Sequence, residues 1–161
     1  MNFRRAKRTD FDAINALYRL CAEDPGTTWN DEYPTLREIE ADYASGGLYI
    51  LTDGAVLAGT AAIASENELD DFDVWRERST PVRELARIAV APDYRGNGYA
   101  LFMVERLLDI LRRDGTSCVR LLAAVGNSPA IRTYEKAGFL HRGTVEAWGE
   151  RYLAMEKRMG E

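Results

Sequence analysis

Apolar residues recur along the chain at two spacings, one typical of helices and one typical of strands. A stripe with helical spacing follows Thr9 or Asp10 as the capping residue, and it consists of Phe11, Ile14, Leu17, Tyr18 and Cys21. Further helices are predicted over residues 35–44, 100–113 and 128–136. Pro34 and Pro129 lie at first-turn positions, which tolerate proline, and Gly115 and Gly138 mark helix ends.

Strand patterns occupy most of the remaining chain. Residues 48–64 form the clearest hairpin, because two apolar runs flank Asp53-Gly54, a pair favoured in tight turns. Further strands are predicted over 2–6, 82–90, 117–125, and over a closing pair, 139–148 and 150–159. Residues 65–81 are acidic and then basic without clear periodicity, so they form a long connection or a lid whose structure the pattern does not define.

The element order β-α-α-β-β-β-α-β-α-β-β predicts one α+β domain over residues 1–161, with about four helices around a mixed sheet. With 46% apolar residues the chain can build a core. The net charge of −5 argues against general binding to nucleic acid or to an acidic membrane. The N-terminus lacks a signal-peptide pattern and no run is long enough to cross a bilayer, which favours a cytoplasmic location.

The turn before the helix at residues 100–113 has an unusual sequence, Arg95-Gly96-Asn97-Gly98. The first N–H groups of a helix have no partner within it and carry a partial positive charge. The two glycines permit close approach of a ligand, and an arginine fork suits phosphate oxygens. The turn therefore predicts an anion site, with a purely geometric turn as the alternative. A P-loop is excluded because no Gly-Lys-Ser/Thr follows, and Leu101 breaks a dinucleotide fingerprint.

Two segments resemble the signatures of the GCN5-related N-acetyltransferase (GNAT) family. Arg95-Gly96-Asn97-Gly98-Tyr99-Ala100 is similar to its Gln/Arg-x-x-Gly-x-Gly/Ala motif, and residues 127–139, NSPAIRTYEKAGF, are similar to its second motif. The resemblance covers nearly the whole element order. It implies a mostly antiparallel sheet that splays in the middle, where acetyl-CoA lies in a V between strands 82–90 and 117–125.

The resemblance also implies the cofactor contacts. The pyrophosphate would bind the amides of Arg95, Gly96, Asn97, Gly98, Tyr99 and Ala100. The pantetheine arm would pair with the backbone of Ile88, Ala89 and Val90 as an added strand, and Asn127 would contact it.

Acetyl transfer to an amine needs a proton for the leaving thiolate and, for an alkyl amine, a base. Tyr134 is the candidate acid, with packing on its helix as the alternative role. Glu84 is the candidate base, because strand alternation would place it on an apolar face with Ala86, Ile88 and Val90. The alternatives for Glu84 are an ion pair or a solvated strand end. Leu122 occupies the position at which some members that acetylate protein N-termini carry a glutamate.

The acceptor site in this family is built from the first helix-loop-helix and the closing strands, so Trp29, Tyr33 and Trp148 are candidate substrate contacts. The acidic loop favours a cationic small molecule as the acceptor amine. Acetylation of a protein N-terminus or lysine is the alternative, and a non-catalytic acyl-CoA sensor is another. No metal ligand cluster is present, His141 is interpreted as structural or surface, and a homodimer is compatible with the family although the sequence does not show one.

Overall fold

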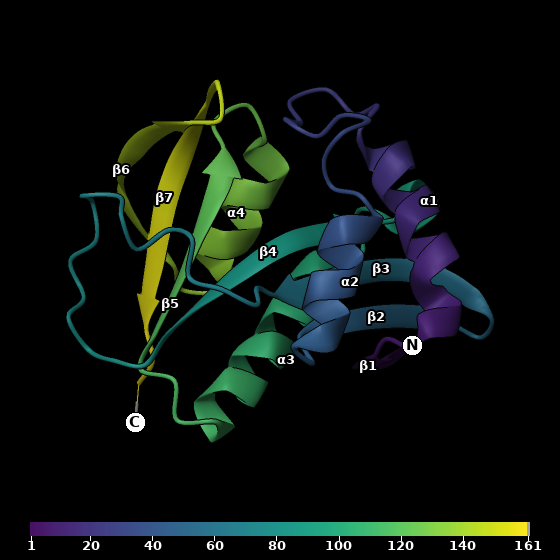
Figure 1. Cartoon of the computed structure of the whole chain (residues 1–161), viewed down its shortest axis with the longest axis horizontal. Helices are drawn as coiled ribbons and strands as arrows, with labels where there is room; N and C mark the ends of the chain where they lie inside the picture. Colours follow the sequence, from purple (N-terminus) through teal and green to yellow (C-terminus); the bar gives the residue numbers. More distant parts are fainter. Residues whose placement is uncertain (161) are drawn as a thin grey trace.

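The computed structural model describes residues 1–160, and its elements follow the predicted order (Figure 1). The strands are β1 (Asn2–Arg5), β2 (Leu48–Asp53), β3 (Val56–Ile63), β4 (Val82–Val90), β5 (Cys118–Ala124), β6 (Leu140–Ala147) and β7 (Glu150–Arg158). The helices are α1 (Phe11–Cys21), α2 (Leu36–Ala44), α3 (Tyr99–Arg113) and α4 (Ser128–Lys136), with short 3-10 turns at Arg8–Asp10 and Pro92–Tyr94.

The seven strands form one sheet in the order β1-β2-β3-β4-β5-β7-β6. Only the β4–β5 pair is parallel, and the other neighbours are antiparallel. The predicted α+β class and the mostly antiparallel mixed sheet are therefore confirmed. Figure 1 shows that β1 to β4 form one half of the sheet and β5 to β7 the other, with α1 and α2 beside the first half.

Alternation along the strands divides the apolar side chains between two faces. On β2, Leu48 and Ile50 pack with α1 and α2, whereas Tyr49 and Leu51 belong to the cluster that contains the α3 residues. The side-chain period of two in a strand produces this division. The amphipathic stripe predicted for α1 is buried against the first of these faces.

The core is organised differently on the two faces of the sheet. On the α3 and α4 face, one apolar cluster extends from Phe3 of β1 to Met155 of β7 and is continuous across both halves. On the α1 and α2 face, the apolar residues form separate clusters. Ile14 and Ile39 lie in a cluster over β2, and Trp75 lies in another over β6 and β7.

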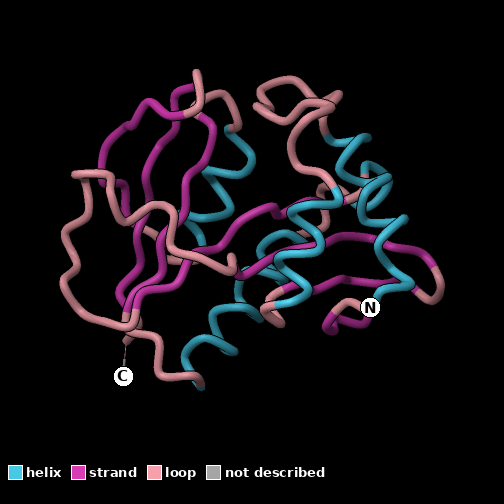
Figure 2. Tube along the Cα trace, in the orientation of Figure 1, coloured by secondary structure: helices cyan, strands magenta, loops and turns pink. Residues whose placement is uncertain are grey.

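Residues 65–81 contain no helix or strand and cover the second half of the sheet, as the loop tracing in Figure 2 shows. The Trp75 indole donates to the Leu69 carbonyl at 2.7 Å, which closes the segment on itself. Glu156 of β7 holds residues 65–81 on the sheet, because its carboxylate accepts hydrogen bonds from the backbone N–H groups of Arg76 and Glu77 at 3.1 Å. The segment is thus a packed cover.

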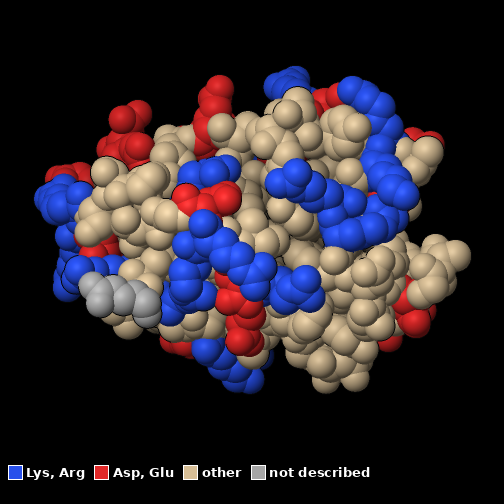
Figure 3. Space-filling model, turned by 90° about the horizontal axis from the view of Figure 1, so that it is seen from below, with Lys and Arg blue, Asp and Glu red and all other residues tan. Residues whose placement is uncertain are grey.

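Charge is distributed unevenly despite the net value of −5. On the face shown in Figure 3, lysine and arginine side chains form broad patches, with acidic side chains between them and at the rim. Among the ion pairs of the chain, Arg4 binds Asp10 at 2.9 Å and Arg8 binds Glu40 at 3.3 Å. Among residues 1–160, no helix is both long and apolar enough to cross a bilayer.

Candidate acetyl-transfer site

The sheet opens between β4 and β5. The two strands pair over three positions, Val82 with Cys118, Arg83 with Val119 and Glu84 with Arg120. Beyond Glu84, β5 pairs only with β7 on its other side, while β4 continues beside β3. Among the described residues no strand covers the β5-facing edge of β4 from Leu85 to Val90, so a gap opens there in which this edge has no strand partner.

The turn at residues 95–98 provides an uncapped helix start above this opening. Gly96 and Gly98 have φ values of 78° and 79°, a conformation that residues with a Cβ rarely adopt. No heavy atom lies within 4 Å of a Cβ built at either glycine, so space above the turn is open. Gly98 is the N-cap of α3 and supplies no side-chain acceptor to the first N–H groups. These groups are available to an anion.

Arg95 does not present its guanidinium to this space, in contrast to the sequence-based expectation of a phosphate fork. It binds both carboxylate oxygens of Asp24, at 2.7 and 3.0 Å, and its Nε donates to the Val90 carbonyl at 3.0 Å. Asn97 is also used locally, because its amide donates to the carbonyls of Tyr94 and Arg95. The side chains of Arg95 and Asn97 are thus used to shape the turn, and they leave its backbone N–H groups free of side-chain partners.

Asn127 is the N-cap of α4, which follows β5, and Tyr134 lies on this helix. The Asn127 side chain caps the helix by accepting from the Ala130 N–H at 3.3 Å, a role that sequence reasoning did not assign to it. Tyr134 is 9% exposed and packs edge-on against Phe139 with ring centroids 6.2 Å apart. Burial raises the pKa of the Tyr134 hydroxyl to about 12. The phenol therefore stays protonated near neutral pH.

The environment of the Tyr134 hydroxyl differs from that of other buried hydroxyls. Among residues 1–160, no protein group forms a hydrogen bond with it, yet it is not one of the fully buried atoms that lack a partner, which are Tyr18 Oη and Arg19 Nε. The hydroxyl therefore keeps contact with solvent. An otherwise buried phenol with an accessible, unpaired O–H can donate to a ligand atom.

The expectation that Glu84 shares a face with Ile88 and Val90 is wrong. A β-bulge interrupts the β3–β4 register, since Thr60 pairs with Ala89 but Ala62 pairs with Ala86, and Arg87 within it has a φ of 52°. The extra residue reverses the alternation. Ile88 and Val90 pack toward the α3 cluster, whereas the Glu84 carboxylate contacts the 65–81 segment on the opposite face.

The Glu84 side chain is nearly fully buried, with 3% exposure. Its two oxygens accept from the backbone N–H groups of Glu68 and Leu69 at 3.1 and 3.0 Å. Burial raises the pKa of this carboxyl to about 7, although the two N–H groups oppose the shift. A group with this pKa can exchange a proton near neutral pH, and it also fixes the start of the 65–81 segment.

The three candidate acceptor contacts lie at two places. Trp29 packs edge-on against Tyr18 at 5.4 Å, and Tyr33 accepts a hydrogen bond from Arg87 at 2.9 Å, so both belong to the α1–α2 side. Trp148 is 67% exposed at the β6–β7 turn and contacts Phe72. The structure therefore separates Trp148 from the other two.

The α1–α2 connection also reaches the second half of the sheet. The Tyr152 hydroxyl of β7 donates to Thr28 Oγ1 at 3.3 Å. Gly26 lies against Gly126, and a Cβ built at Gly26 would stand 2.4 Å from the Gly126 carbonyl oxygen. The two halves of the open sheet are thus bridged at their far end by a contact that requires glycine.

Sequence reasoning missed a polar cluster beside the bulge, formed by Tyr18, Tyr33, Asp42 and Arg87. Arg87 binds the 1%-exposed Asp42 carboxylate in a bidentate pair at 2.7 and 2.8 Å. The two partners lie 45 positions apart in the chain, so no local pattern joins them. The sequence did contain one signal of this cluster. Asp42 is a polar residue at a position that helical spacing places beside the buried Ile39.

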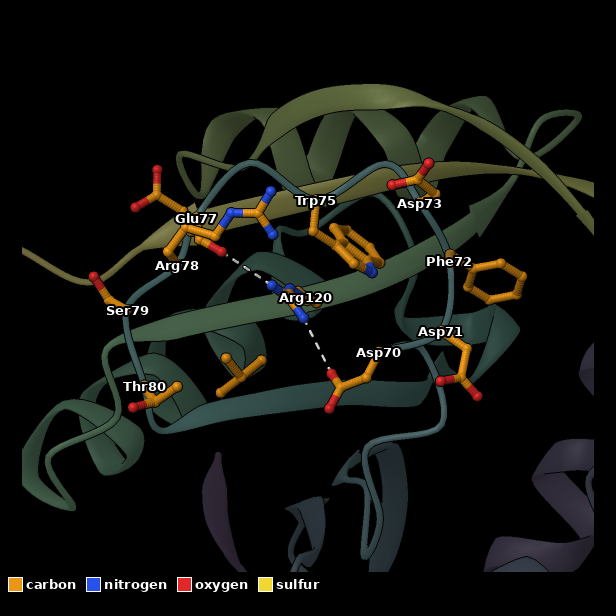
Figure 4. A pocket seen from close by; sticks show the side chains of 11 residues that line it. Asp70, Asp71, Phe72, Asp73, Trp75, Glu77, Arg78, Ser79, Thr80 and Arg120 are labelled. Carbon is orange, nitrogen blue, oxygen red and sulfur yellow. Dashed lines mark hydrogen bonds and ion pairs between the residues drawn. The ribbon is translucent and has the colours of Figure 1, made fainter.

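A cavity of about 540 Å³ is lined by residues of the 65–81 segment together with Val82 and Arg120. Figure 4 shows Arg120 in its centre, directed toward Asp70 and Glu77. The Arg120 guanidinium also binds Glu156 and lies 4.9 Å from the Trp75 ring, so three of its five N–H donors are used within the protein. This cavity holds an internal ion network. Among residues 1–160, no group of three or more potential metal-ligating side chains is present.

Residues 14–139 match the sequence model of the Acetyltransferase (GNAT) family, which is more than half of the chain. The chain belongs to this family. An uncharacterized N-acetyltransferase of Methanocaldococcus jannaschii is 32% identical over 48% of this chain and 33% of its own length. The ribosomal protein bS18-alanine N-acetyltransferase of Escherichia coli is 38% identical over 34% of this chain and 37% of its own. The matched part of the chain thus spans about a third of these curated relatives.

Solved structures share the fold over nearly the whole chain. A putative acetyltransferase from Salmonella typhimurium, solved with acetyl-CoA, has a TM-score of 0.78 and 22% identity, covering 100% of this chain and 95% of that one. A GNAT acetyltransferase from Streptococcus agalactiae has a TM-score of 0.82 and 21% identity, covering 99% and 96%. The family assignment and the open sheet agree with these neighbours.

Proposed function

We propose that this GNAT domain transfers the acetyl group of acetyl-CoA to a primary amine, by direct attack of the amine in a ternary complex. The observation that carries the proposal is the free edge of β4 from Leu85 to Val90, with the uncapped turn of Gly96 and Gly98 at its end. The turn amides bind the pyrophosphate, and Ile88 to Val90 hydrogen-bond the pantetheine as an added strand.

The direction of the cofactor follows from these two contacts. The pyrophosphate lies at the C-terminal end of β4, so the pantetheine extends back toward the seam where β4 and β5 meet. The thioester then reaches the level of the bulge at Arg87. A backbone N–H of this strand stabilises the carbonyl oxygen during attack. Asn127 fixes the start of α4, which lines the other side of the opening.

Tyr134 donates a hydrogen bond to the departing thiolate. A thiol of the cysteine type has a pKa near 8.5, well below the value of about 12 for Tyr134. Complete proton transfer from the phenol to the thiolate is therefore unfavourable. Tyr134 instead stabilises the thiolate by donating a hydrogen bond. Tyr134 lies on the α3 and α4 face, so the acceptor amine approaches from the α1 and α2 face.

Glu84 accepts the amine proton through a water molecule. Its pKa of about 7 is matched to neutral pH, and a carboxylate has about four acceptor positions, of which the Glu68 and Leu69 N–H groups use two. The competing role is that of an anchor for the 65–81 segment. The pH profile described in the Discussion separates the two roles.

The acceptor expected from the sequence is a cationic small molecule. The support for this acceptor is the negative charge of the 65–81 segment. Asp70 contributes little to it, because Arg120 at 3.0 Å balances its charge. Relatives include a ribosomal protein bS18-alanine N-acetyltransferase and mycothiol acetyltransferases. Proteins with related sequences are therefore named for a protein acceptor in one case and for a small thiol compound in the other. A non-catalytic acyl-CoA module is the alternative from another class, and it would bind CoA tightly without turnover.

The test combines cofactor binding with turnover. Gly98→Glu should abolish acetyl-CoA binding in calorimetry, because it places a carboxylate at the turn. Gly115→Glu is the matched control, since Gly115 has a φ of 82° at the other end of α3 and should give nearly wild-type affinity. CoA release is then measured over a panel of amino amides, polyamines, aminoglycosides and lysine peptides. Equal acetyl-CoA affinity in the two variants would refute the pyrophosphate assignment.

A further inference from the structure

The polar cluster of Tyr18, Tyr33, Asp42 and Arg87 lies at the bulge of β4, on the α1 and α2 face. Arg87 has a φ of 52°, which L-residues rarely adopt, and its side chain is 12% exposed. The bidentate pair with Asp42 and the bond to Tyr33 hold it in this conformation. Tyr33 is 42% exposed, so the cluster can be reached from solvent.

The hydrogen-bonding capacity that remains in this cluster is mainly donor capacity. A guanidinium has five N–H donors. Three of them are used, two on Asp42 and one on the Tyr33 hydroxyl. The Tyr33 hydroxyl accepts this bond and so keeps its own O–H. The Tyr18 hydroxyl is fully buried and has no partner among residues 1–160.

An unpaired hydroxyl in a buried position is uncommon, because it loses its hydration without compensation. Tyr18 of α1 lies in the same buried cluster as Ile39, which is one helical turn before Asp42 on α2, so it packs on the side of the sheet that holds Arg87. Burial raises the pKa of the Tyr18 hydroxyl. Tyr18 therefore retains a proton that it can donate. The three sets of free donors lie on β4, on α1 and on the segment before α2.

The net charge of the cluster determines which acceptor groups its hydrogen-bond donors can bind. The Asp42 carboxylate balances the Arg87 guanidinium, and Glu38 adds a further negative charge nearby, so no positive charge is left over for a second carboxylate. A second carboxylate would be uncompensated in this half-buried place, whereas a neutral carbonyl oxygen accepts the same hydrogen bonds without added charge. A neutral amide carbonyl is therefore the preferred guest.

We infer that this cluster binds the carbonyl oxygen of an α-amino acyl group, and so selects acceptors whose amine is one carbon away from an amide. This inference rests on the proposed function, because the thioester end of acetyl-CoA lies at the bulge only if the cofactor binds along β4. An amine next to the bound carbonyl then faces the thioester from the α1 and α2 face, opposite Tyr134. Tyr18, Tyr33 and Arg87 are positioning and specificity residues.

The substrate test uses three compounds of similar size. Alaninamide carries the neutral carbonyl, alanine carries a carboxylate, and 3-methylbutan-2-amine keeps the amine and the shape of alaninamide but replaces the amide by an isopropyl group. Calorimetric titration into the CoA-loaded protein should give at least tenfold tighter binding of alaninamide than of either other compound. Equal binding of alaninamide and the alkyl amine would overturn the inference, and tighter binding of alanine would reassign the cluster to carboxylates.

The variant test isolates the hydroxyl. Tyr18→Phe should raise the KM and the Kd of alaninamide about five- to tenfold and leave both values unchanged for the alkyl amine. Differences in amine basicity cancel, because each compound is compared with itself in two proteins. Tyr43→Phe is the matched control, since Tyr43 packs on Phe11 between the same helices and should change neither compound. An equal loss for both compounds in Tyr18→Phe would indicate a structural role and overturn the inference.

The outcomes also separate this inference from the proposed function. If alaninamide binds selectively but no amine is acetylated, the transferase proposal fails and the recognition site stands. If amines are acetylated without any preference for the carbonyl, the transferase proposal stands and the recognition site fails. Tyr33→Phe, which removes a second donor, should reproduce the selective loss of alaninamide binding.

Discussion

Substitution of Glu156 by glutamine tests whether one buried carboxylate holds the 65–81 segment on the sheet. Glu156 is fully buried, and its oxygens lie 2.8 Å from Arg142 Nε and 3.0 Å from Arg120 Nε. They also accept the backbone N–H groups of Arg76 and Glu77. Glutamine keeps the shape of this side chain but replaces one acceptor oxygen by a donor and removes the charge.

The expected loss of stability can be estimated in two ways. Removing one partner of a buried ion pair costs about 3–5 kcal/mol. We expect about 3 kcal/mol for Glu156→Gln, the lower end of this range, because Asp70 and Glu77 still compensate the charges of Arg120 and Arg142. Hydrogen bonds from Arg142 and Arg120 and from the two backbone N–H groups lower the pKa of Glu156 from 4.5 to about 2, against its burial. That shift corresponds to about 3 kcal/mol, which agrees with the first figure.

The sign of the pH dependence follows from the lowered pKa. The stabilisation by Glu156 is fully present above pH 4.5 and is lost as the pH falls toward 2. Urea unfolding should therefore show Glu156→Gln to be about 3 kcal/mol less stable than the wild type at pH 7, with a difference at pH 3 reduced by about half. Trypsin should also cleave the variant faster after Arg76 and Arg78.

Glu146→Gln is the control, because Glu146 forms an exposed pair with Arg151 at 3.1 Å and should cost less than about 0.5 kcal/mol. Two results would refute the reasoning. A loss below about 1 kcal/mol at pH 7 would mean that the ion network does not hold the segment. A loss of equal size at pH 7 and pH 3 would mean that shape and not charge accounts for the effect.

Three further predictions concern catalysis. Tyr134→Phe should lower kcat by about tenfold to a hundredfold with little change in acetyl-CoA affinity, in stopped-flow and calorimetry; unchanged kcat would remove Tyr134 from the reaction. Glu84→Gln should remove the inflection near pH 7 from the kcat/KM profile, because that pKa belongs to the carboxyl, whereas an unmoved inflection would leave Glu84 as an anchor only. Gly26→Ala should raise the acceptor KM and leave acetyl-CoA affinity unchanged, since its Cβ would displace the α1–α2 loop from Gly126, and Gly54→Ala, at a positive φ in an open turn, provides the comparison.

The elements were predictable from local signals. Helical spacing located α1, and Asp53-Gly54 located the β2–β3 turn, because these signals lie within a few residues of each other. The turn at Gly96 and Gly98 was located by glycines that need a positive φ. Such features depend on the conformation of short segments, which the residue types largely determine.

The errors arose where contacts join distant parts of the chain. Alternation along β4 failed at Arg87 because a bulge follows from pairing with β3 and from Asp42, neither of which lies nearby in the sequence. Arg95 was assigned to phosphate because Asp24 is 71 positions away. A side chain's chemistry was visible in the sequence in both cases, but its partner was not.

The unequal organisation of the two core faces has a consequence for how this fold diversifies. The apolar cluster from Phe3 to Met155 ties both halves of the sheet together under α3 and α4. The opposite face is divided into separate clusters under the α1–α2 side and the 65–81 segment. Substitutions on one of these patches do not disturb the packing of the other. If the acceptor binds on this face, as proposed above, its preference can change by mutation of one patch at a time, while the shared cluster preserves the rest of the scaffold.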